Sequence, residues 1–587
     1  MLKLVKYFKP FILALLALVV LTFGQVATTL ALPDYMATII NKGVVAKDSG
    51  VILSTGTMML TVALLGAVCM IGVGFLAARI ATGFAKNIRE LTFRQVEGFS
   101  LAEFDTFSTA SLITRSTNDV QQIQMVLVML LRIALMAPIM GIWAILKAYQ
   151  LAPSMTWIMA LAVGVLLCMI ATLFVVALPK FKKLQKTVDR LNLVTREILT
   201  GLRVIRAFNT HRAEEQKFDG VNRELTRLNL FVNRLMVVLM PAMMLIIGLT
   251  SIAIIWVGAH EVDAGNLLIG NMIAFMQYSM QVIFAFLMLS IIFILVPRAA
   301  VSAGRVEEVI ATKPQILDPL RRKRTQPSAG GVVEFKDVTF SYPGAAEPVF
   351  KNVSFTARPG ETTAIVGSTG SGKTTLVNLI PRFYDVSSGS IIVDGVDVRE
   401  QKMEDLYHKI GYVPQRGVLF SGTVETNLKY GAPRASDEQM RRAASIAQAA
   451  DFIGELEGGY DAPIAQGGQN ISGGQKQRLA IARALLHDPE IFIFDDSFSA
   501  LDFKTDARLR EALAQETSDK TIIIVAQRIT TIMNAEKIIV LNEGAIVGEG
   551  THAELLGNCT VYKEIAGSQL SDEELTRSRP ALRRKTA

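Results

Sequence analysis

Six stretches of the sequence are long and apolar enough to cross a lipid bilayer, and no other feature constrains the fold as strongly. A transmembrane helix needs about 20 consecutive apolar residues, because the hydrocarbon core of a bilayer is about 30 Å thick. The stretches lie before residue 300 and cover residues 10–32, 53–76, 126–145, 154–178, 235–259 and 267–296. We therefore expect residues 1–312 to form an all-α transmembrane domain of six spans in contact with the lipid bilayer.

The first stretch has a second interpretation. Lys3, Lys6 and Lys9 precede its apolar core, which is also the pattern of a cleaved secretory signal peptide. However, the apolar stretch is longer than the core of such a peptide, and no small-residue cleavage site ends it. We therefore interpret it as a membrane helix.

Lysine and arginine gather on one side of the predicted membrane domain. They flank the first span and follow the second and the fourth, at Lys3, Lys6, Lys9, Arg79, Lys86, Arg89, Arg94, Lys180, Lys182, Lys183 and Lys186. The connections on the other side, 34–50, 147–153 and 260–266, contain fewer cations. Because positive flanks stay in the cytoplasm, we expect both the N-terminus and the C-terminal half to be cytoplasmic. The net charge of +8 is assigned to these flanks and to two basic segments further along the chain, a linker at 313–331 and a tail at 571–587. The positive charge therefore does not indicate that the protein binds nucleic acid.

Two connections on the cytoplasmic side, 77–125 and 179–234, are too long to be turns. Their apolar and charged residues recur with helical spacing. The simplest physical interpretation is that the membrane helices continue into the cytosol. Such extensions can act as levers that carry motion from a soluble domain to the bilayer.

Four residues within the spans are candidates for a substrate cavity. Arg132 is an intramembrane cation that faces either a wet cavity or a partner group, or else reaches the cytoplasmic interface by snorkelling. Met240, Met276 and Met280 belong to the methionine-rich last two spans. Flexible thioethers suit the binding of varied apolar compounds, and they equally suit ordinary helix packing.

Composition changes near residue 313. Residues 313–331 contain prolines and a basic run and are interpreted as a polar linker. From Val332, short β-branched runs alternate with helical patterns, which predicts an α/β domain with a largely parallel sheet over residues 332–570. The charged tail, 571–587, is expected to be disordered.

The strongest motif is a glycine-rich loop that follows a predicted strand at 363–366 and opens a helix at Leu376. The loop contains Gly367, Ser368, Thr369, Gly370, Ser371, Gly372, Lys373, Thr374 and Thr375. The glycines let backbone amides surround phosphates, Lys373 supplies a positive charge to the β and γ phosphates, and the Thr374 hydroxyl can bind Mg²⁺. In this strand, loop and helix context the pattern predicts a P-loop that binds ATP.

Residues 491–495 form an apolar run that ends in Asp495 and predicts a buried strand. A P-loop ATPase needs an acid at the carboxyl end of such a strand to hold the magnesium shell. The run alone would be a weak signal, but downstream of a P-loop it is strong.

Between these motifs, Ser472, Gly473, Gly474 and Gln475 precede a predicted helix, and a serine with two glycines at a helix N-terminus can bind an anion. Together the motifs resemble the ATP-binding cassette (ABC) superfamily, and the chain resembles a half-transporter of the type IV exporter group. The resemblance implies bound ATP and Mg²⁺, and two cassettes that close over two nucleotides. It also implies that the segment from Ser472 to Gln475 grips the γ phosphate of ATP on the opposite subunit.

Further positions match the family's motifs one at a time. Tyr342 stands where the family stacks an aromatic ring on adenine, and Gln415 where a glutamine contacts magnesium and senses the membrane domain. Segments 109–119 and 196–208 resemble the cytoplasmic extensions whose coupling helices dock on the cassettes. The loop that crosses the family's dimer interface is matched by Ser499, Ala500, Leu501 and Asp502.

Three positions depart from the family pattern. The family places glutamate directly after the magnesium aspartate to polarise the attacking water, whereas this chain has Asp496, one methylene shorter. The family's switch histidine is replaced by Gln527, and Gln466-Gly467 replaces the usual Glu-Arg before the signature. We expect slow hydrolysis at this site, because about 1 Å of misplacement can cost on the order of 100-fold in rate.

Two altered groups at one ATP site, with an intact signature on the same chain, resemble the degenerate subunit of a heterodimeric bacterial multidrug exporter. The resemblance implies a second ABC half-transporter subunit with the catalytic glutamate and the switch histidine, and a small hydrophobic or amphipathic substrate. A slow homodimer, a lipid or peptide transporter, and a non-hydrolysing ATP-binding subunit that gates its partner are the alternatives. The membrane spans exclude the soluble cassette functions in DNA repair and translation.

Overall fold

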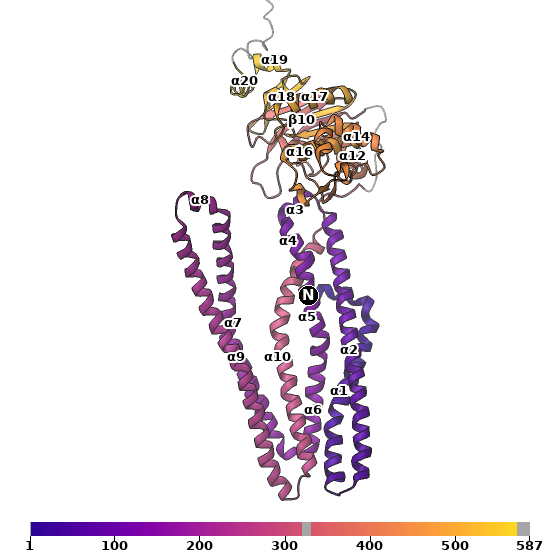
Figure 1. Ribbon diagram of the computed structural model, residues 1–587, viewed down its shortest axis with the longest axis vertical. Helices are drawn as coiled ribbons and strands as arrows, with labels where there is room; N and C mark the ends of the chain where they lie inside the picture. Colours follow the sequence, from indigo (N-terminus) through magenta and orange to yellow (C-terminus); the bar gives the residue numbers. More distant parts are fainter. Residues whose placement is uncertain (1, 320–329, 572–587) are drawn as a thin grey trace, which may run out of the picture. The chain divides into compact units, whose positions relative to one another are not determined.

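The computed structural model describes residues 2–319 and 330–571, which fall into two units (Figure 1). The membrane unit comprises Met1–Glu97 and Thr109–Thr312, and the second unit comprises Gly98–Ser108 and the chain from Lys313. The expected disordered tail lies outside the described residues from position 572 onward, as does the basic run of the expected linker at 320–329.

Among the described residues, six long helical stretches form the membrane unit, and each is long and apolar enough to cross a bilayer. They are Lys6–Val44, Ser49–Glu97, Thr109–Leu151, Pro153–Thr200, His211–Asp263 and Ile269–Ala311. The predicted six spans are thereby confirmed. The predicted extensions are confirmed too, because the stretches run from 39 to 53 residues where about 20 would cross the bilayer.

The α-helices of this unit are α1 (Ile12–Thr38), α2 (Ser49–Glu97), α4 (Thr109–Thr114), α5 (Val120–Met129), α6 (Leu135–Leu151), α7 (Thr156–Thr200), α8 (Leu202–Ala207), α9 (His211–Asp263) and α10 (Ile269–Ala311). π-Helical turns at Ile39–Val44, Arg115–Asp119 and Leu130–Ala134 continue α1 and join α4 to α5 and α5 to α6. The last turn precedes Pro138, which has no N–H to donate to the carbonyl of Ala134, so the regular α-helical pattern is broken there.

A polar contact joins three spans within the apolar packing of α1, α6 and α10. The buried Tyr278 of α10 donates its hydroxyl proton to Asp34 Oδ1 of α1 at 2.6 Å. The second carboxylate oxygen of Asp34 pairs with Lys147 Nζ of α6 at 2.7 Å. Each charge of this pair therefore has a partner, at positions 34 and 147, just beyond the ends of the predicted spans 10–32 and 126–145.

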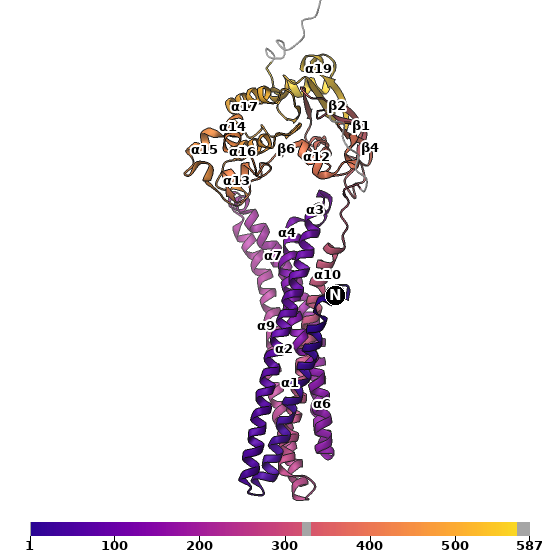
Figure 2. The same cartoon turned by 90° about the vertical axis from the view of Figure 1, so that its right-hand side faces the viewer.

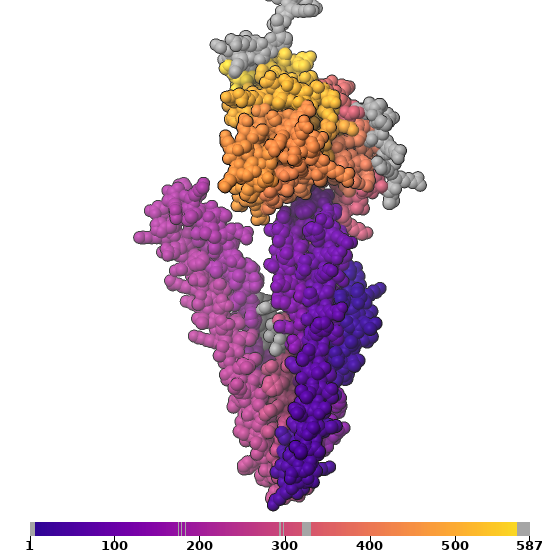
Figure 3. All heavy atoms as spheres, turned by 45° about the vertical axis from the view of Figure 1, so that its right-hand side comes forward, coloured from indigo at the N-terminus to yellow at the C-terminus, as the bar shows by residue number. Residues whose placement is uncertain are grey.

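α7 and α9 run side by side and are joined at their tip by α8 (Figure 1). Ion pairs link the two helices in the cytoplasmic extension, between Lys183 and Glu224 at 3.1 Å and between Lys217 and Glu197 at 2.8 Å. The space-filling view shows the α8 end as a separate arm of the unit (Figure 3). The tip itself carries exposed apolar side chains, among them Val204 and Phe208.

The second unit contains two main sheets. The six-stranded sheet has the order β12 (Ala545–Gly550), β11 (Lys537–Asn542), β3 (Thr362–Gly367), β10 (Thr521–Val525), β9 (Ile491–Asp495) and β6 (Ile410–Val413). The four-stranded antiparallel sheet has the order β2 (Phe350–Ala357), β1 (Val333–Phe340), β4 (Ser388–Val393) and β5 (Val396–Asp397), and β7 (Gly422–Thr423) pairs with β8 (Pro463–Ile464). The predicted α/β architecture with a largely parallel sheet is confirmed, because β11, β3, β10, β9 and β6 pair in parallel.

The helices of this unit are α3 (Leu101–Phe107), α11 (Lys373–Asn378), α12 (Met403–Lys409), α13 (Val424–Leu428), α14 (Asp437–Ile446), α15 (Ala450–Glu455), α16 (Gly473–Leu486), α17 (Phe503–Glu516), α18 (Ile529–Ile532), α19 (His552–Asn558) and α20 (Thr560–Gly567). Figure 2 shows β1, β2 and β4 at one side of the unit and α13–α16 at the other.

β9 divides the hydrophobic core of this unit into two parts. All five of its residues are buried. Phe492 and Phe494 pack in one cluster, with Leu479 of α16, while Ile491 and Ile493 pack in the other. The side chains of a strand alternate between the two faces of a sheet, so a continuous apolar run is what a strand covered on both faces requires.

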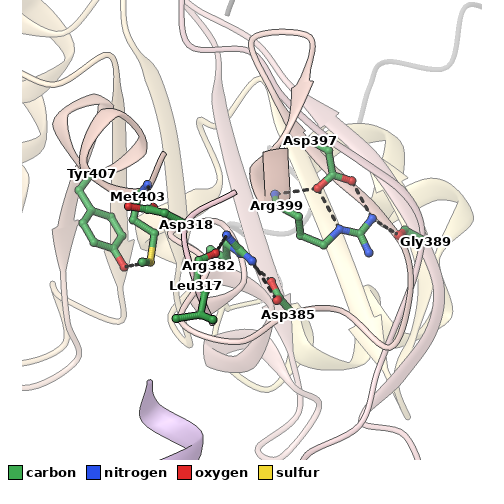
Figure 4. A network of polar contacts seen from close by, with 9 residues as sticks. All are labelled: Leu317, Asp318, Arg382, Asp385, Gly389, Asp397, Arg399, Met403 and Tyr407. Carbon is green, nitrogen blue, oxygen red and sulfur yellow. Dashed lines mark hydrogen bonds and ion pairs between the residues drawn. The ribbon is translucent and has the colours of Figure 1, made fainter. Parts of the chain in front are cut away.

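The start of the linker is fixed to the second unit by hydrogen bonds (Figure 4). The buried Arg382 donates to the Leu317 carbonyl at 3.2 Å and forms an ion pair with Asp385. Asp318 accepts a hydrogen bond from the backbone N–H of Met403, the first residue of α12, at 2.8 Å. Because the first N–H groups of a helix have no partner within it, this carboxylate satisfies one of them.

A buried aspartate joins the end of the linker to the sheet. Asp394 is 1% exposed, accepts hydrogen bonds from the N–H groups of Gly331 at 2.7 Å and Val332 at 3.0 Å, and forms an ion pair with Lys409. Removing one partner from a buried ion pair leaves an uncompensated charge, which is among the more costly changes a fold can suffer.

We predict that Asp394→Ala lowers the free energy of unfolding of this unit by about 3 kcal/mol, because two amides and a mostly buried ammonium lose their carboxylate. Hydrogen exchange of β1 and β9 in the full chain at increasing denaturant measures the change. The control, Glu404→Ala, removes the exposed partner of Lys402 and should cost far less, because an exposed ion pair contributes little to stability. Equal losses in the two variants would contradict the prediction.

Candidate nucleotide-binding site

The carboxyl ends of four parallel strands meet at one edge of the six-stranded sheet. β3, β10, β9 and β6 are adjacent in that order, and Val525 at the end of β10 pairs with Ile365 of β3 and with Asp495 of β9. Each strand leads into a segment that the sequence singled out: the P-loop, Gln527, Asp495 with Asp496, and Gln415. Parallel strands therefore bring together groups that are far apart in the chain, such as Thr374 and Asp495, which are 121 positions apart.

The P-loop closes around its own lysine. Gly372, just before α11, has a φ of 93°, a left-handed conformation that glycine adopts without strain. Lys373 Nζ donates to the carbonyls of Gly367 at 2.9 Å and Ser368 at 2.8 Å. Burial lowers the pKa of this ammonium, while nearby carboxylates raise it. The remaining predicted residues, Thr369, Gly370, Ser371, Thr374 and Thr375, belong to the same loop and the first turn of α11.

Thr374 and Asp495 are two of the three residues that the sequence predicts as magnesium ligands, and Gln415 is the third. Thr374 Oγ1 donates to Asp495 Oδ1 at 3.0 Å. Asp495 is 1% exposed, and burial raises the pKa of its carboxyl above the ordinary value, against the effect of the Thr374 hydrogen bond. A hydroxyl at the end of the P-loop and a carboxylate at the end of β9 fit Mg²⁺, which binds few protein oxygens and keeps several waters. Across residues 2–319 and 330–571, no group of three or more His, Cys, Asp or Glu side chains could hold a metal by itself.

Asp496 lies at the same edge, directly after the magnesium aspartate. Its carboxylate is almost buried and accepts a hydrogen bond from Gln415 Nε2 at 3.2 Å. Its backbone has a φ of 45°, a left-handed conformation that aspartate tolerates better than most residues, and its N–H donates to the Val525 carbonyl at 2.8 Å. The main chain at Asp496 is therefore fixed to β10, and the reach of the carboxylate depends on the side chain alone.

Gln527 follows β10 on an exposed bend. Hydrogen bonds from a residue near the C-terminal end of the described chain hold this bend in place. Gln569, after α20, donates from Nε2 to the Gln527 carbonyl at 2.9 Å and accepts at Oε1 from the Ile529 N–H at 2.8 Å. No local sequence pattern identifies Gln569 as part of the site, because the contact joins residues 42 positions apart.

The loop Ser499–Asp502 is held by its neighbours in the site. Ser499 Oγ donates to the Asp496 carbonyl at 2.8 Å, and Arg528 Nη2 donates to the Ser499 carbonyl at 3.3 Å. Ala500 and Leu501 complete the loop, and the Asp502 side chain caps α17 by accepting from the Thr505 N–H. Arg528, which is not among the residues predicted from the sequence, therefore joins the Gln527 segment to this loop.

The Ser472–Gln475 segment starts α16 with a capping box. Gln475 N–H donates to Ser472 Oγ at 3.3 Å, and Ser472 N–H donates to Gln475 Oε1 at 2.9 Å. Gly474 lies against the Ser499–Asp502 loop, since a Cβ at this position would be 3.1 Å from the Ala500 oxygen. Gly473 starts the helix, and a Cβ added at this position would point into open space. Gln466 and Gly467 lie nearby in the chain on an exposed turn, where Gly467 has a φ of 63°.

Tyr342 lies after β1 and beside the P-loop helix. Its hydroxyl is 2.9 Å from Thr375 Oγ1. Its ring meets the ring of Phe340 edge to face, with centroids 5.0 Å apart. The side chain is partly exposed, so it has a surface that a base could contact.

Four residues of the membrane unit were predicted as candidates for a substrate cavity, and no hydrogen bond or ion pair among the described residues joins them. Arg132 lies on the π-helical turn before α6 and is exposed. Met240 of α9 is 60% exposed, whereas Met276 of α10 packs against the cluster of α1, α6 and α10. Met280 is partly buried one turn further along α10.

Comparison with known proteins assigns both halves of the chain. A family model of the ABC transporter transmembrane region matches residues 15–286, and a model of the ABC transporter matches residues 350–499. The chain is 41% identical to an ABC transporter ATP-binding protein of Mycobacterium bovis over 569 residues, which are 96% of this chain and 97% of that protein. It is also similar to the ATP-dependent lipid A-core flippase of Desulfotalea psychrophila, with 33% identity over 487 residues, 81% of this chain and 83% of the flippase.

A solved structure of a bacterial Atm1-family ABC exporter with ATP bound has a similar fold. The TM-score is 0.77 with 23% sequence identity, and the match covers 96% of this chain and 99% of that one. At this identity the likeness concerns the fold alone.

The raised pKa of Asp495 predicts a pH dependence. A proton and Mg²⁺ would compete for this carboxylate, so Mg²⁺-dependent ATP binding should weaken as the pH falls from neutral, and at a higher pH than an ordinary aspartate would cause. ATP titrations at several pH values, with Mg²⁺ and with a chelator, measure this difference. Asp495→Asn should bind Mg²⁺ weakly at every pH. A wild-type profile no different from that of Asp495→Asn would show that the carboxylate does not bind the metal.

Proposed function

Because the chain belongs to the ABC transporter family, we propose that it is one subunit of a heterodimeric, ATP-driven exporter in the cell membrane of a bacterium. In this proposal its own P-loop, Asp495, Asp496 and Gln527 form a slow ATP site with Mg²⁺. Its intact segment from Ser472 to Gln475 completes the faster site, whose P-loop and catalytic glutamate belong to the partner.

The observation that carries the proposal is the pair Asp496 and Gln527 at the edge of the sheet. The carboxylate of Asp496 is withdrawn by one C–C bond, roughly 1.5 Å, relative to glutamate. Its main chain is held by the hydrogen bond to Val525, so the backbone cannot advance to restore the lost reach. Gln527 has no ring nitrogen to offer to a γ phosphate. Both substitutions weaken the polarisation and positioning of an attacking water, which accounts for a slow site.

The intact signature favours two different subunits over two copies of this chain. In a homodimer both composite sites would contain Asp496 and Gln527, and both would be slow. In a heterodimer, Ser472 at the start of α16 serves the partner's ATP, where its N-terminal amides can bind phosphate. The capping box of Ser472 and Gln475 keeps that helix start well ordered.

The proposal predicts unequal effects of two substitutions in the reconstituted pair. Ser472→Arg places a bulky cation in the phosphate-facing helix start of the partner's site and should lower ATP turnover by about 100-fold, the order expected when groups around the reacting phosphate are misplaced. Lys373→Ala, at this chain's own site, should lower turnover less than about tenfold, because that site contributes little hydrolysis. Steady-state ATPase assays measure both. A larger loss for Lys373→Ala would contradict the assignment.

The double variant Asp496→Glu with Gln527→His should raise hydrolysis at this chain's own site by about 100-fold, because it restores the carboxylate reach. The readout is ATP turnover in a pair whose partner's glutamate has been changed to glutamine, so that only this chain's site can hydrolyse. The single variant Gln527→His, which leaves the short carboxylate, is the matched control and should stay slow.

Three measurements separate the alternatives: ATP turnover in this altered pair, substrate transport by the intact pair, and ATP turnover by this chain alone. If turnover survives near its normal rate after the partner's glutamate is removed, this chain already carries an active site. If the pair hydrolyses ATP but moves no substrate with it, the chain is a regulatory clamp that gates its partner. Full turnover by this chain alone would favour a homodimer.

A hydrophobic or amphipathic compound is the substrate class we propose, exported from the cytoplasmic side. The exposed Met240 and the further methionines of α9 and α10 suit varied apolar ligands. A lipid is the second candidate, supported by the 33% identity to a protein named a lipid A-core flippase. ATP-dependent transport of dyes and of labelled lipids in vesicles that contain both subunits distinguishes the two classes.

A further inference from the structure

The bend at 527–529 leaves the sheet between the P-loop and the carboxylates of the nucleotide-binding site. β10 ends at Val525 and pairs with β3 on one side and with β9 on the other. After β10, the Ala526 N–H still donates to the Ile365 carbonyl of β3 at 3.2 Å. A residue that follows β10 therefore lies between the P-loop, which follows β3, and Asp495, which ends β9.

The bend passes directly into a short helix that its own sequence does not cap. α18 begins at Ile529, and Arg528, at the N-cap position, makes no side-chain capping hydrogen bond. The first N–H groups of a helix have no partner within that helix. Gln569 supplies a partner from a distant part of the chain, because its Oε1 accepts a hydrogen bond from the Ile529 N–H at 2.8 Å.

The same side-chain amide also binds the main chain before Arg528. Gln569 Nε2 donates to the Gln527 carbonyl at 2.9 Å. One amide therefore holds the main chain on both sides of Arg528, as a neighbouring strand would. Because its oxygen can only accept and its nitrogen can only donate, the amide fits this stretch of main chain in a single orientation.

Gln569 is itself held by the hydrophobic core. It follows α20, and its N–H and that of Leu570 both donate to the Ala566 carbonyl, at 3.1 and 2.9 Å. Ala566 and Leu570 are buried in the same core cluster as Ile529. The Gln569 amide therefore joins two pieces of main chain that the core already fixes, and only the middle of the bend reaches the surface.

Arg528 extends this set of contacts to the loop at 499–502. Its guanidinium donates to the Ser499 carbonyl at 3.3 Å and lies over the Phe503 ring, 5.3 Å from the centroid. Ser499 Oγ donates in turn to the Asp496 carbonyl at 2.8 Å. A displacement of the bend would therefore also disturb the loop that supports Asp496.

We propose that Gln569 is a positioning residue of this ATP site, which fixes the main chain from which the Gln527 side chain reaches a bound γ phosphate. The inference rests on the proposed function only in taking Gln527 as a group of the ATP site. The amide nitrogen of Gln527 can donate to a phosphate oxygen. Such a bond contributes more to affinity when less of the chain has to be ordered on binding, and Gln569 orders this main chain before the nucleotide binds.

The γ phosphate is the group that distinguishes ATP from ADP. The position of Gln527 should therefore affect the affinity for ATP and leave the affinity for ADP unchanged. A residue that only stabilised the fold would change both affinities equally, or neither. The ratio of the two dissociation constants thus separates a positioning role from a structural one.

The test is the affinity of the full-length chain for ATP and for ADP, each with Mg²⁺, in lipid nanodiscs that hold one copy, so that no second subunit contributes a contact. Gln569→Met keeps the length of an exposed side chain and removes both hydrogen bonds of the amide. We expect it to weaken ATP binding about fivefold, the order of one net hydrogen bond, and to leave ADP binding unchanged. Ser568→Ala removes the neighbouring hydroxyl, whose hydrogen bond goes to the Ile565 carbonyl of α20. It is the matched control and should change neither affinity.

A double-variant cycle shows whether the effect of Gln569 depends on Gln527. Gln527→Ala alone should weaken ATP binding and leave ADP binding unchanged. In that background Gln569→Met should have no further effect, because no side chain is left to position. Hydrogen exchange in Gln569→Met should be faster at 527–529 and unchanged in β9 and β10.

The inference is wrong if Gln569→Met binds ATP as tightly as the wild type, or if it weakens ATP and ADP binding equally. It is also wrong if the wild type shows no preference for ATP over ADP, or if the fivefold loss persists in the Gln527→Ala background. Faster exchange in β9 and β10 would show that the contact serves the fold as a whole. None of these results decides the proposed heterodimer, which stands or fails on ATP turnover in the pair of subunits.

Discussion

Parallel pairing of β3, β10, β9 and β6 is the constraint on which the nucleotide-binding unit depends. Strands that run in the same direction end at the same edge of the sheet. Each of these four strands leads into a segment whose polar groups belong to the candidate nucleotide-binding site. The edge collects the P-loop, the adjacent carboxylates of Asp495 and Asp496, and two glutamines from four segments that are far apart in sequence. Because all five residues of β9 are buried on both faces of the sheet, the edge is backed by a core that fixes its geometry.

Because the geometry of this edge is fixed, the single methylene by which Asp496 is shorter than glutamate changes the position of its carboxylate. A side chain on a mobile loop could compensate for lost length by a small backbone shift. Asp496 has no such freedom, since its N–H is bonded to β10 and its carbonyl to Ser499. The proposed division of labour between two subunits therefore follows from side-chain length at a position where the main chain is held.

The features that sequence predicted well are those with a local physical signal. The six spans and β9 are continuous apolar runs, and the P-loop is a glycine-rich segment between a strand and a helix. The contacts of Gln569 with the Gln527 bend and of Tyr384 with Asp105 were not predictable, because each joins distant segments through folding alone. The start of α3 did have a signal, the capping-box spacing of Ser100 and Glu103, but the docking of that helix on the linker depends on tertiary contact.

The inclusion of Gly98–Ser108 in the second unit has a consequence for how the protein is made. This segment leaves the ribosome long before the strands against which Ala102 packs, and both of its ends are tied to helices that enter the membrane. The nucleotide-binding unit is therefore assembled from two pieces synthesised at different times. Its core can close only after the intervening spans have been synthesised, and a C-terminal fragment made alone would lack part of its own interior.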